Sequence, residues 1–198
     1  MLDGKVAYIN VGLFKRADSL QLKELVANAN DLIIDNRQNQ DEIKGTGGGD
    51  IIGGLIMQEQ NAFVRFSTAQ PTFPGVFTLT SPTNMGTTGS KNCFKGKVVI
   101  LVNENTMSVG ELLTMAYQKA LHARIVGTTT SGADGNVTYI TLPGNFFVQF
   151  TGLGVYYPNG KETQRVGIEP DIVVKQTIQG YANNEDEQLM KAVNYLRK

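Results

Sequence analysis

Ser108 and Glu111 stand at a junction where a hydroxyl could act as a nucleophile. The apolar run 97–103 predicts a buried strand, and the segment 108–121 after it predicts a helix. A serine at such a junction lies beside unpaired backbone N–H groups and the positive end of the helix dipole, which would stabilise a developing oxyanion. Ser-x-x-Glu is also the capping box of ordinary helices, in which Ser108 would only be an N-cap. The four-residue pattern taken alone favours the cap.

A second candidate is the glycine-rich segment 45–50, which again lies between an apolar run and a probable helix. Glycines let backbone N–H groups approach a ligand closely. The segment matches neither phosphate-loop nor dinucleotide-binding spacing, and Asp50 at the helix start would repel an anion, so nucleotide binding is disfavoured. What remains is a flexible loop, or a glycine among Gly47, Gly48 and Gly49 that gives a second N–H to an oxyanion hole.

No residue in the sequence is an evident general base for Ser108. His122 is the only histidine, and a helix over 108–121 would separate it from Ser108 by about 20 Å. Lys119 lies about three turns along the same helix, which is also too far. Three other lysines fall in loops, so their reach to Ser108 stays open: Lys44, Lys91 and Lys161. With one histidine and one cysteine there is no metal-ligand cluster, and we expect neither a metal nor a cofactor.

Composition excludes several classes of function. The 198 residues suffice for one domain, or at most two small ones, with a sizeable core. Eighteen basic and eighteen acidic residues give no net charge, which argues against a nucleic-acid partner. No run of about 18 apolar residues is present, so we expect no membrane span. Cys93 is alone and cannot form an internal disulfide.

The elements that must position these residues alternate between strands and helices, which predicts an α/β fold with a largely parallel central sheet flanked by helices. An antiparallel β excursion is expected after Gly135, where two runs alternate in period two around a Pro-Gly-Asn turn. The expected core strands cover 6–11, 32–34, 97–103, 123–127 and 172–174; the expected helices cover 19–29, 50–58, 108–121 and 183–196; the expected antiparallel pairs are 63–67 with 76–80 and 137–142 with 146–150; and 82–92 is expected to be a loop.

Four further segments occur in a characteristic order: 33–39 (Ile-Ile-Asp-Asn-Arg-Gln-Asn), 124–132 (strand and glycine turn), 154–160 (Gly-Val-Tyr-Tyr-Pro-Asn-Gly) and 167–172 (Gly-Ile-Glu-Pro-Asp-Ile). With the serine turn they resemble the tail-specific, or C-terminal processing, serine proteases, whose relatives include the tricorn core protease. The resemblance spans most of the chain. It implies a crotonase- or Clp-protease-like core and raises Ser108 from a cap to the expected nucleophile.

The resemblance also implies roles for other residues. Backbone N–H groups of Val109 and of Gly48 or Gly49 would form the oxyanion hole. Glu111 would orient or cap the helix, and Gln164 would be a polar neighbour of the site, where relatives place an acid. The substrate would be a polypeptide, in unstructured or C-terminal segments, and the location would be the periplasm or cell envelope of a bacterium.

Two departures leave the general base missing. Many members carry a catalytic lysine directly after the glycine turn, where this chain has Ala133, and the tricorn-like members have a glutamate at the position of Gln164. The loop 39–48 is also longer than in the family, which weakens the oxyanion assignment there. In one interpretation residues 1–198 are a single catalytic core excised from a longer chain, and the base comes from outside this chain. The isolated chain would then be a poor protease.

In the other interpretation the domain has lost proteolysis and keeps a peptide-binding cleft. Acyl-CoA chemistry on a related crotonase-like architecture is a weaker third alternative, because the Tyr-Tyr and Pro-Asp segments match the proteases.

Overall fold

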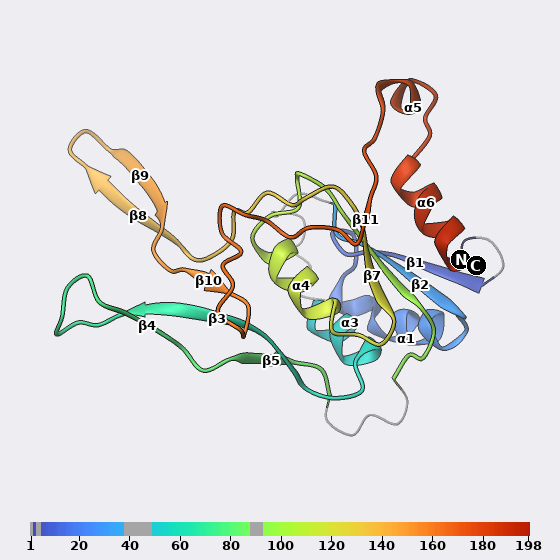
Figure 1. Cartoon of the computed structure of the whole chain (residues 1–198), viewed down its shortest axis with the longest axis horizontal. Coiled ribbons are helices and arrows are strands. Elements are labelled where there is room, and N and C mark those ends of the chain that lie inside the picture. Colours follow the sequence, from blue (N-terminus) through green and yellow to red (C-terminus); the bar gives the residue numbers. More distant parts are fainter. Residues whose placement is uncertain (1, 3–4, 38–48, 88–92) are drawn as a thin grey trace.

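A five-stranded parallel sheet forms the centre of the molecule (Figure 1). The computed structural model describes the whole chain except residues 1, 3–4, 38–48 and 88–92. The strands lie in the order in which they occur along the chain, and each pairs in parallel with its neighbour. They are β1 (Val6–Asn10), β2 (Asp31–Asp35), β6 (Val98–Val102), β7 (Ala123–Gly127) and β11 (Ile172–Val173). The predicted parallel core is confirmed.

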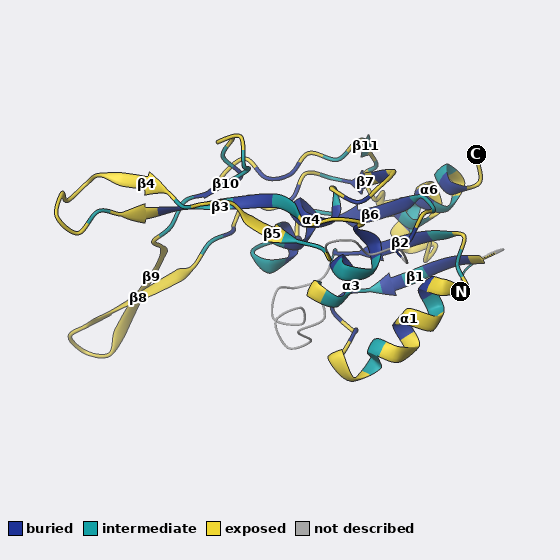
Figure 2. Cartoon of the chain, turned by 90° about the horizontal axis from the view of Figure 1, so that it is seen from below, coloured by how far each residue is buried: buried dark blue, intermediate teal, exposed yellow. Residues whose placement is uncertain are grey.

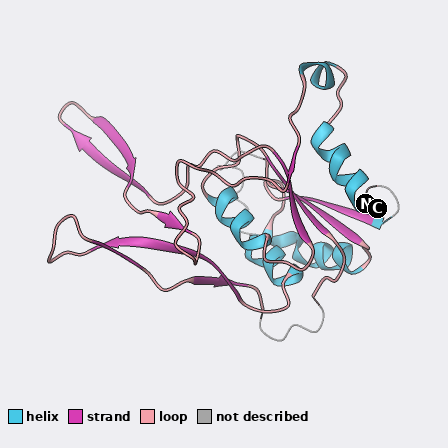
Figure 3. Cartoon of the chain, viewed as in Figure 1, coloured by secondary structure: helices cyan, strands magenta, loops and turns pink. Residues whose placement is uncertain are grey.

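Both faces of the sheet are buried, which explains why its central strands are continuous apolar runs. Along β6, Val98, Ile100 and Val102 face one core, whereas Val99 and Leu101 face the other. The first core lies under α1 (Ser19–Ala27), α3 (Gly49–Ile56) and α4 (Val109–Tyr117), and the second lies under α6 (Glu187–Leu196) (Figures 1 and 3). On α1, α3 and α6 the buried residues recur three or four apart, as the helical period requires, whereas α4 is buried on most of its sides.

Antiparallel strands extend from one end of this body. A long strand, β3, packs beside α4 and pairs with three short strands, and a separate two-stranded ribbon carries the chain outward after Gly135 (Figures 1 and 2). These strands are β3 (Asn61–Ala69), β4 (Phe77–Leu79), β5 (Thr83–Met85), β8 (Val137–Leu142), β9 (Phe146–Thr151) and β10 (Val155–Tyr156). Both predicted antiparallel pairs are confirmed, β3 with β4 and β8 with β9.

The structure differs from the prediction at several places. The expected helix 183–196 begins only at Glu187, as α6, because Asn184 has a φ of 56° and Asp186 is the N-cap of α6; a separate short helix, α5 (Ile178–Ala182), precedes the expected range. Helix α4 ends at Tyr117, after which the backbone tightens into bonds three residues apart. Strand β5 forms inside the expected loop 82–92, and a short 3-10 helix, η2 (Arg16–Asp18), precedes α1. Among the described residues, no helix has both the length and the apolar character needed to cross a bilayer.

Candidate active site

Ser108 occupies a strained corner between β6 and α4. Its backbone has φ 48° and ψ −116°, a conformation that side-chain-bearing residues rarely adopt and that is characteristic of nucleophiles held on sharp strand-to-helix turns. Its side chain makes no capping hydrogen bond to α4. The capping-box interpretation is therefore wrong for the hydroxyl of Ser108, which is left available for other chemistry.

The N–H of Val109, next to Ser108, has no hydrogen-bond partner among the described residues. The N–H of Ser108 donates to the carbonyl of Ala133 (2.9 Å), and the N–H of Gly110 donates to the carbonyl of Met107 (2.9 Å). Between them, the N–H of Val109 makes no hydrogen bond to any residue that the structure describes. As the first residue of α4, Val109 also stands at the positive end of the helix dipole. An anion at this corner would find a free donor.

Glu111 is fully buried and ties the glycine turn after β7 to the first turn of α4. Its carboxylate accepts hydrogen bonds from the hydroxyl of Thr130, from the N–H of Gly132 (2.8 Å) and from the N–H of Ala133 (2.9 Å). Burial raises the pKa of Glu111, and these hydrogen bonds oppose the rise. The backbone N–H of Ser108 also contributes to lowering the pKa of Glu111. Glu111 therefore supports the corner through the segment 130–133, to which Ser108 is itself bonded, and through the backbone of Ser108.

A second buried carboxyl, Asp134, follows directly on this segment. It is 2% exposed; its Oδ2 accepts from the hydroxyl of Thr163 (2.9 Å), and its Oδ1 has no partner among the described residues. Burial, with the nearby charge of Glu111, raises the pKa of Asp134 to about 6. Gln164 lies beside it and donates through Nε2 to the carbonyls of Asp134 (2.7 Å) and Leu153 (2.8 Å). Gln164 thus holds the backbone at the base of the β8–β9 ribbon.

Asn36, at the end of β2, fixes α4 from the other side. It is fully buried, and its Nδ2 donates to the hydroxyl of Thr114 (3.0 Å) and to the carbonyl of Gly110 (3.3 Å). The hydroxyl of Thr106 in turn donates to the carbonyl of Asn36 (2.9 Å). The turn before Ser108 and the first turn of α4 are therefore both bonded to the neighbouring strand end, which makes the corner rigid.

The other predicted residues are placed as follows. Gly48 and Gly47 lie outside the described residues, as do Lys44 and Lys91. Gly49 begins α3 and lies against α4, because its carbonyl accepts from the hydroxyl of Tyr117 (2.9 Å) and a Cβ on it would overlap Leu113. His122 precedes β7, at the edge of the parallel sheet opposite to Ser108. Lys161 is exposed in the turn after Tyr157.

Within the described part of the chain, no lysine or histidine is hydrogen-bonded to Ser108. The same part contains no group of three or more His, Cys, Asp or Glu side chains that could hold a metal ion.

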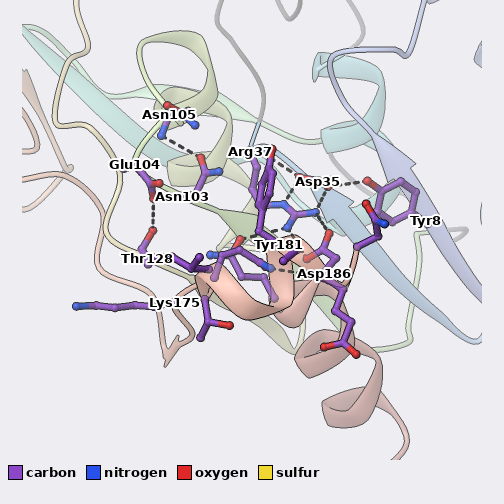
Figure 4. A pocket seen from close by; sticks show the side chains of 17 residues that line it. Tyr8, Asp35, Arg37, Asn103, Glu104, Asn105, Thr128, Lys175, Tyr181 and Asp186 are labelled. Atoms are coloured by element: carbon purple, nitrogen blue, oxygen red, sulfur yellow. Dashed lines mark hydrogen bonds and ion pairs between the residues drawn. The ribbon is translucent and has the colours of Figure 1, made fainter.

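A separate open cleft of about 1280 Å³ lies at the carboxyl edge of the sheet, between the strand ends and α5 (Figure 4). Arg37 forms ion pairs there with Asp35 (2.6 Å) and Asp186 (2.7 Å), and the hydroxyl of Tyr8 also donates to Asp35 (2.6 Å). Burial lowers the pKa of Arg37, but its bonds to the two carboxylates outweigh this and raise it. Ser108 does not line this cleft. The ion pairs of Arg37 therefore attach the C-terminal arm, residues 175–198, to the end of β2. The cleft is distinct from the corner at Ser108.

Reasoning from the sequence missed Asp134, Thr130 and Thr163. Asp134 directly follows the position at which the family pattern shows a lysine, and this was the one available signal. Its burial depends on Thr163, 29 residues further along the chain, which spacing alone does not reveal.

Comparison with known proteins identifies the family of this chain. The model of the family described as "Peptidase family S41" matches residues 5–174. A carboxy-terminal-processing protease of Bartonella bacilliformis is 35% identical over 81 residues, which cover 41% of this chain and 19% of that protein. Among solved structures, a Parabacteroides merdae protein assigned as a peptidase superposes with a TM-score of 0.78 at 18% identity, covering 99% of this chain and 62% of the other.

The photosystem II D1 C-terminal processing protease has the same fold, with a TM-score of 0.60 and 18% identity over 86% of this chain and 42% of that protein. The chain thus spans less than two thirds of the length of each of these relatives. The family match covers most of the described sheet and includes the serine corner. The chain belongs to peptidase family S41.

Proposed function

We propose that this chain is the catalytic core of a serine endopeptidase in which Ser108 is the nucleophile. One observation carries the proposal: Ser108 is held in a strained backbone conformation at a strand-to-helix corner, and its hydroxyl does not cap the helix. Strain of this kind persists where the surrounding structure enforces it, and it is frequent at catalytic residues. Membership of the S41 family and the likeness to a carboxy-terminal-processing protease support peptide-bond hydrolysis.

The reaction would proceed by covalent catalysis. Ser108 Oγ attacks the carbonyl carbon of the scissile peptide bond while its proton passes to a general base. The negative charge that develops on the carbonyl oxygen is held by the N–H of Val109 and by an N–H from Gly48 or Gly49. The base returns the proton to the leaving amine, and water then hydrolyses the acyl-enzyme. Glu111 keeps segment 130–133 bonded to Ser108 throughout.

The general base is proposed to come from outside this chain. Two observations support this: no described lysine or histidine is bonded to Ser108, and Gln164, at the position where the family resemblance implies an acid, cannot serve as a base. Substrates are proposed to be unstructured or C-terminal polypeptide segments, in the envelope of a bacterium. The same two observations favour one alternative, a catalytically inactive module that binds peptides on this fold.

Labelling with a fluorophosphonate tests the proposal. The reagent forms a phosphonyl ester with an activated serine hydroxyl, and mass spectrometry of the digested protein locates the adduct. We expect the adduct on Ser108, its loss in Ser108→Ala, and its retention in the matched control Ser131→Ala, which removes an exposed serine of the neighbouring turn. If the base lies outside the chain, the labelling rate should rise with hydroxide concentration without a plateau, since hydroxide then removes the proton.

Three results would contradict parts of this proposal. An adduct that persists in Ser108→Ala removes the nucleophile assignment. A labelling rate with a plateau near neutral pH, together with efficient cleavage of an unfolded protein, shows that a base is present within the chain. Saturable binding of an unfolded peptide with neither labelling nor cleavage favours the inactive module.

A further inference from the structure

The β8–β9 ribbon projects from the body with both of its faces in solvent (Figures 1 and 2). Every residue of the two six-residue strands is exposed, although eight of the twelve are large hydrophobic side chains. An isolated two-stranded ribbon is at best marginally stable in water, because it buries little apolar surface. A ribbon of this composition therefore needs something to pack against.

The strand register places the apolar residues mainly on one face. Directly opposed residues share a face, so the pairs Ile140 with Val148 and Leu142 with Phe146 lie together, and Phe150 extends the same side. We call these five residues the apolar ribbon face. Thr138 lies on this face too. The opposite face is mixed, with Val137, Tyr139 and Phe147 beside Thr141, Gln149 and Thr151. One side of the ribbon thus has the pattern of a core-facing sheet without a core against it.

The ribbon also lacks the features that keep exposed strands monomeric. No charged residue occurs in the segment 136–152, and the six residue pairs of β8 and β9 follow one another without a bulge. Proteins normally protect exposed strand edges with lysine, proline or bulges. An unprotected and uncharged ribbon is expected to be covered in the working form of the protein.

The exposed area is large enough for a dimer. Phe146 is 70% exposed, and the other members of the apolar ribbon face are 43 to 46% exposed. With about 150–250 Å² for a whole aromatic side chain and somewhat less for the aliphatic ones, the face presents about 500 Å² of apolar surface. Two copies face to face would bury about 1,000 Å², the area at which specific interfaces begin.

A second uncharged arm leaves the body at the same end. Residues 66–87 carry no charge, and their hairpin exposes Phe73, Val76, Phe77 and Leu79 (Figure 1). Including this arm approximately doubles the available apolar area and brings it to that of a standard interface, about 1,600 Å² in total. The two arms, 66–87 and 136–152, therefore lack the charges that would select an oppositely charged partner.

We propose that the apolar ribbon face is the interface through which two copies of this chain form a symmetric dimer. A surface without charge is complementary to itself, because a two-fold axis places the same apolar face on both sides with no like-charge contact. The area argument independently fits a second copy. The proposal does not depend on peptidase activity, so Ser108→Ala should dimerise like the unmodified chain.

Sedimentation equilibrium of the 198-residue chain tests the proposal. We expect a monomer–dimer equilibrium with a dissociation constant below about 100 µM. The double variant Ile140→Glu with Phe146→Glu charges the apolar ribbon face and should weaken dimerisation by about 100-fold or more, because like charges would then face each other across the axis. The matched control Thr141→Glu with Gln149→Glu adds the same charge to the opposite face and should dimerise within about threefold of the unmodified chain. Thermal unfolding followed by circular dichroism verifies that each variant is folded.

Several outcomes would overturn the proposal. They are a monomer up to about 100 µM, a dimer that survives the charged apolar face, and equal disruption by the control. A monomeric chain that binds vesicles of phosphatidylcholine through the same five residues would show that the face contacts lipid instead. Concentration-dependent protection of the 137–151 amides from hydrogen exchange, lost in the double variant alone, would support the dimer.

Discussion

Replacing Ser108 with glycine should stabilise the fold, although serine-to-glycine changes at helix starts are ordinarily destabilising. The native φ of 48° and ψ of −116° are strained for serine and open to glycine. A non-glycine residue in such a region lowers the free energy of unfolding by about 1–3 kcal/mol. Glycine loses about 0.4–1 kcal/mol more conformational entropy on folding. The difference is a net gain of about 0–2.6 kcal/mol in the free energy of unfolding for Ser108→Gly.

Ser108→Ala should leave the free energy of unfolding almost unchanged. Alanine keeps the strain, and the serine hydroxyl that it removes makes no capping bond. At an ordinary N-cap, by contrast, replacing the capping residue with alanine lowers the free energy of unfolding by about 1 kcal/mol, and replacing it with glycine lowers it by a few tenths. Thr177 is such a cap, because its hydroxyl accepts from the N–H of Gly180 (2.9 Å) at an ordinary φ of −91°. Thr177→Ala and Thr177→Gly are therefore matched controls in which both changes should destabilise.

Urea denaturation of the four variants gives the comparison directly, provided that the m-values stay equal. The reasoning would be refuted if Ser108→Gly were less stable than the unmodified protein, or if Ser108→Ala lost about 1 kcal/mol as an ordinary cap does. Either result would mean that the surrounding hydrogen bonds do not strain Ser108. The hydroxyl would then have the structural role that the capping box first indicated.

Three other substitutions test the surroundings of the site. Burial raises the pKa of Asp134 from 3.8 to about 6, so its ionisation lowers the free energy of unfolding above about pH 6, and this loss disappears as the pH falls towards 3.8. Relative to Asp134→Asn, the free energy of unfolding should rise by up to about 3 kcal/mol between about pH 8 and pH 4. Urea denaturation at each pH measures this, and parallel pH profiles of the two proteins would contradict it. Glu111→Gln places an amide against two N–H donors and a hydroxyl and should lower the free energy of unfolding by about 2–4 kcal/mol. An unchanged denaturation midpoint would show that the carboxylate of Glu111 does not hold segment 130–133 in place. In Arg37→Lys the lysine cannot bind two carboxylates in bidentate fashion, so cleavage within residues 175–198 by an added protease should accelerate about tenfold or more, while Ser108 is still labelled. Equal cleavage rates would show that the ion pairs of Arg37 do not attach the C-terminal arm.

The parallel sheet was predictable because its signal is local. Strands β2 and β6 are apolar runs that must be buried on both faces, and each run identifies its own strand. The start of α6 at Glu187 was not predictable in the same way, since it depends on the backbone of Asn184 and on Asp186 bonding both Leu189 and Arg37. An apolar stripe indicates that a helix exists more reliably than where it begins.

The site was predictable in part. The sequence pattern placed Ser108 at the correct corner, because the end of a strand and the start of a helix can both be recognised from neighbouring residues. Its backbone conformation could not be derived, since it results from bonds to Ala133 and to segments far along the chain. The unpartnered Oδ1 of Asp134 is likewise a property of packing between distant segments.

The order of the central strands has a consequence for where a substrate can approach. In sheets whose connections reverse direction, two neighbouring loops diverge and open a crevice at the reversal. Here the strands succeed one another from β1 to β11 without any reversal, so the sheet itself opens no such gap. The walls around Ser108 must then be built by insertions, and the long excursions after β2 and β7 are the parts of the chain able to supply them. Variation in specificity among proteins of this architecture is accordingly expected to lie in those insertions, while the sheet stays constant.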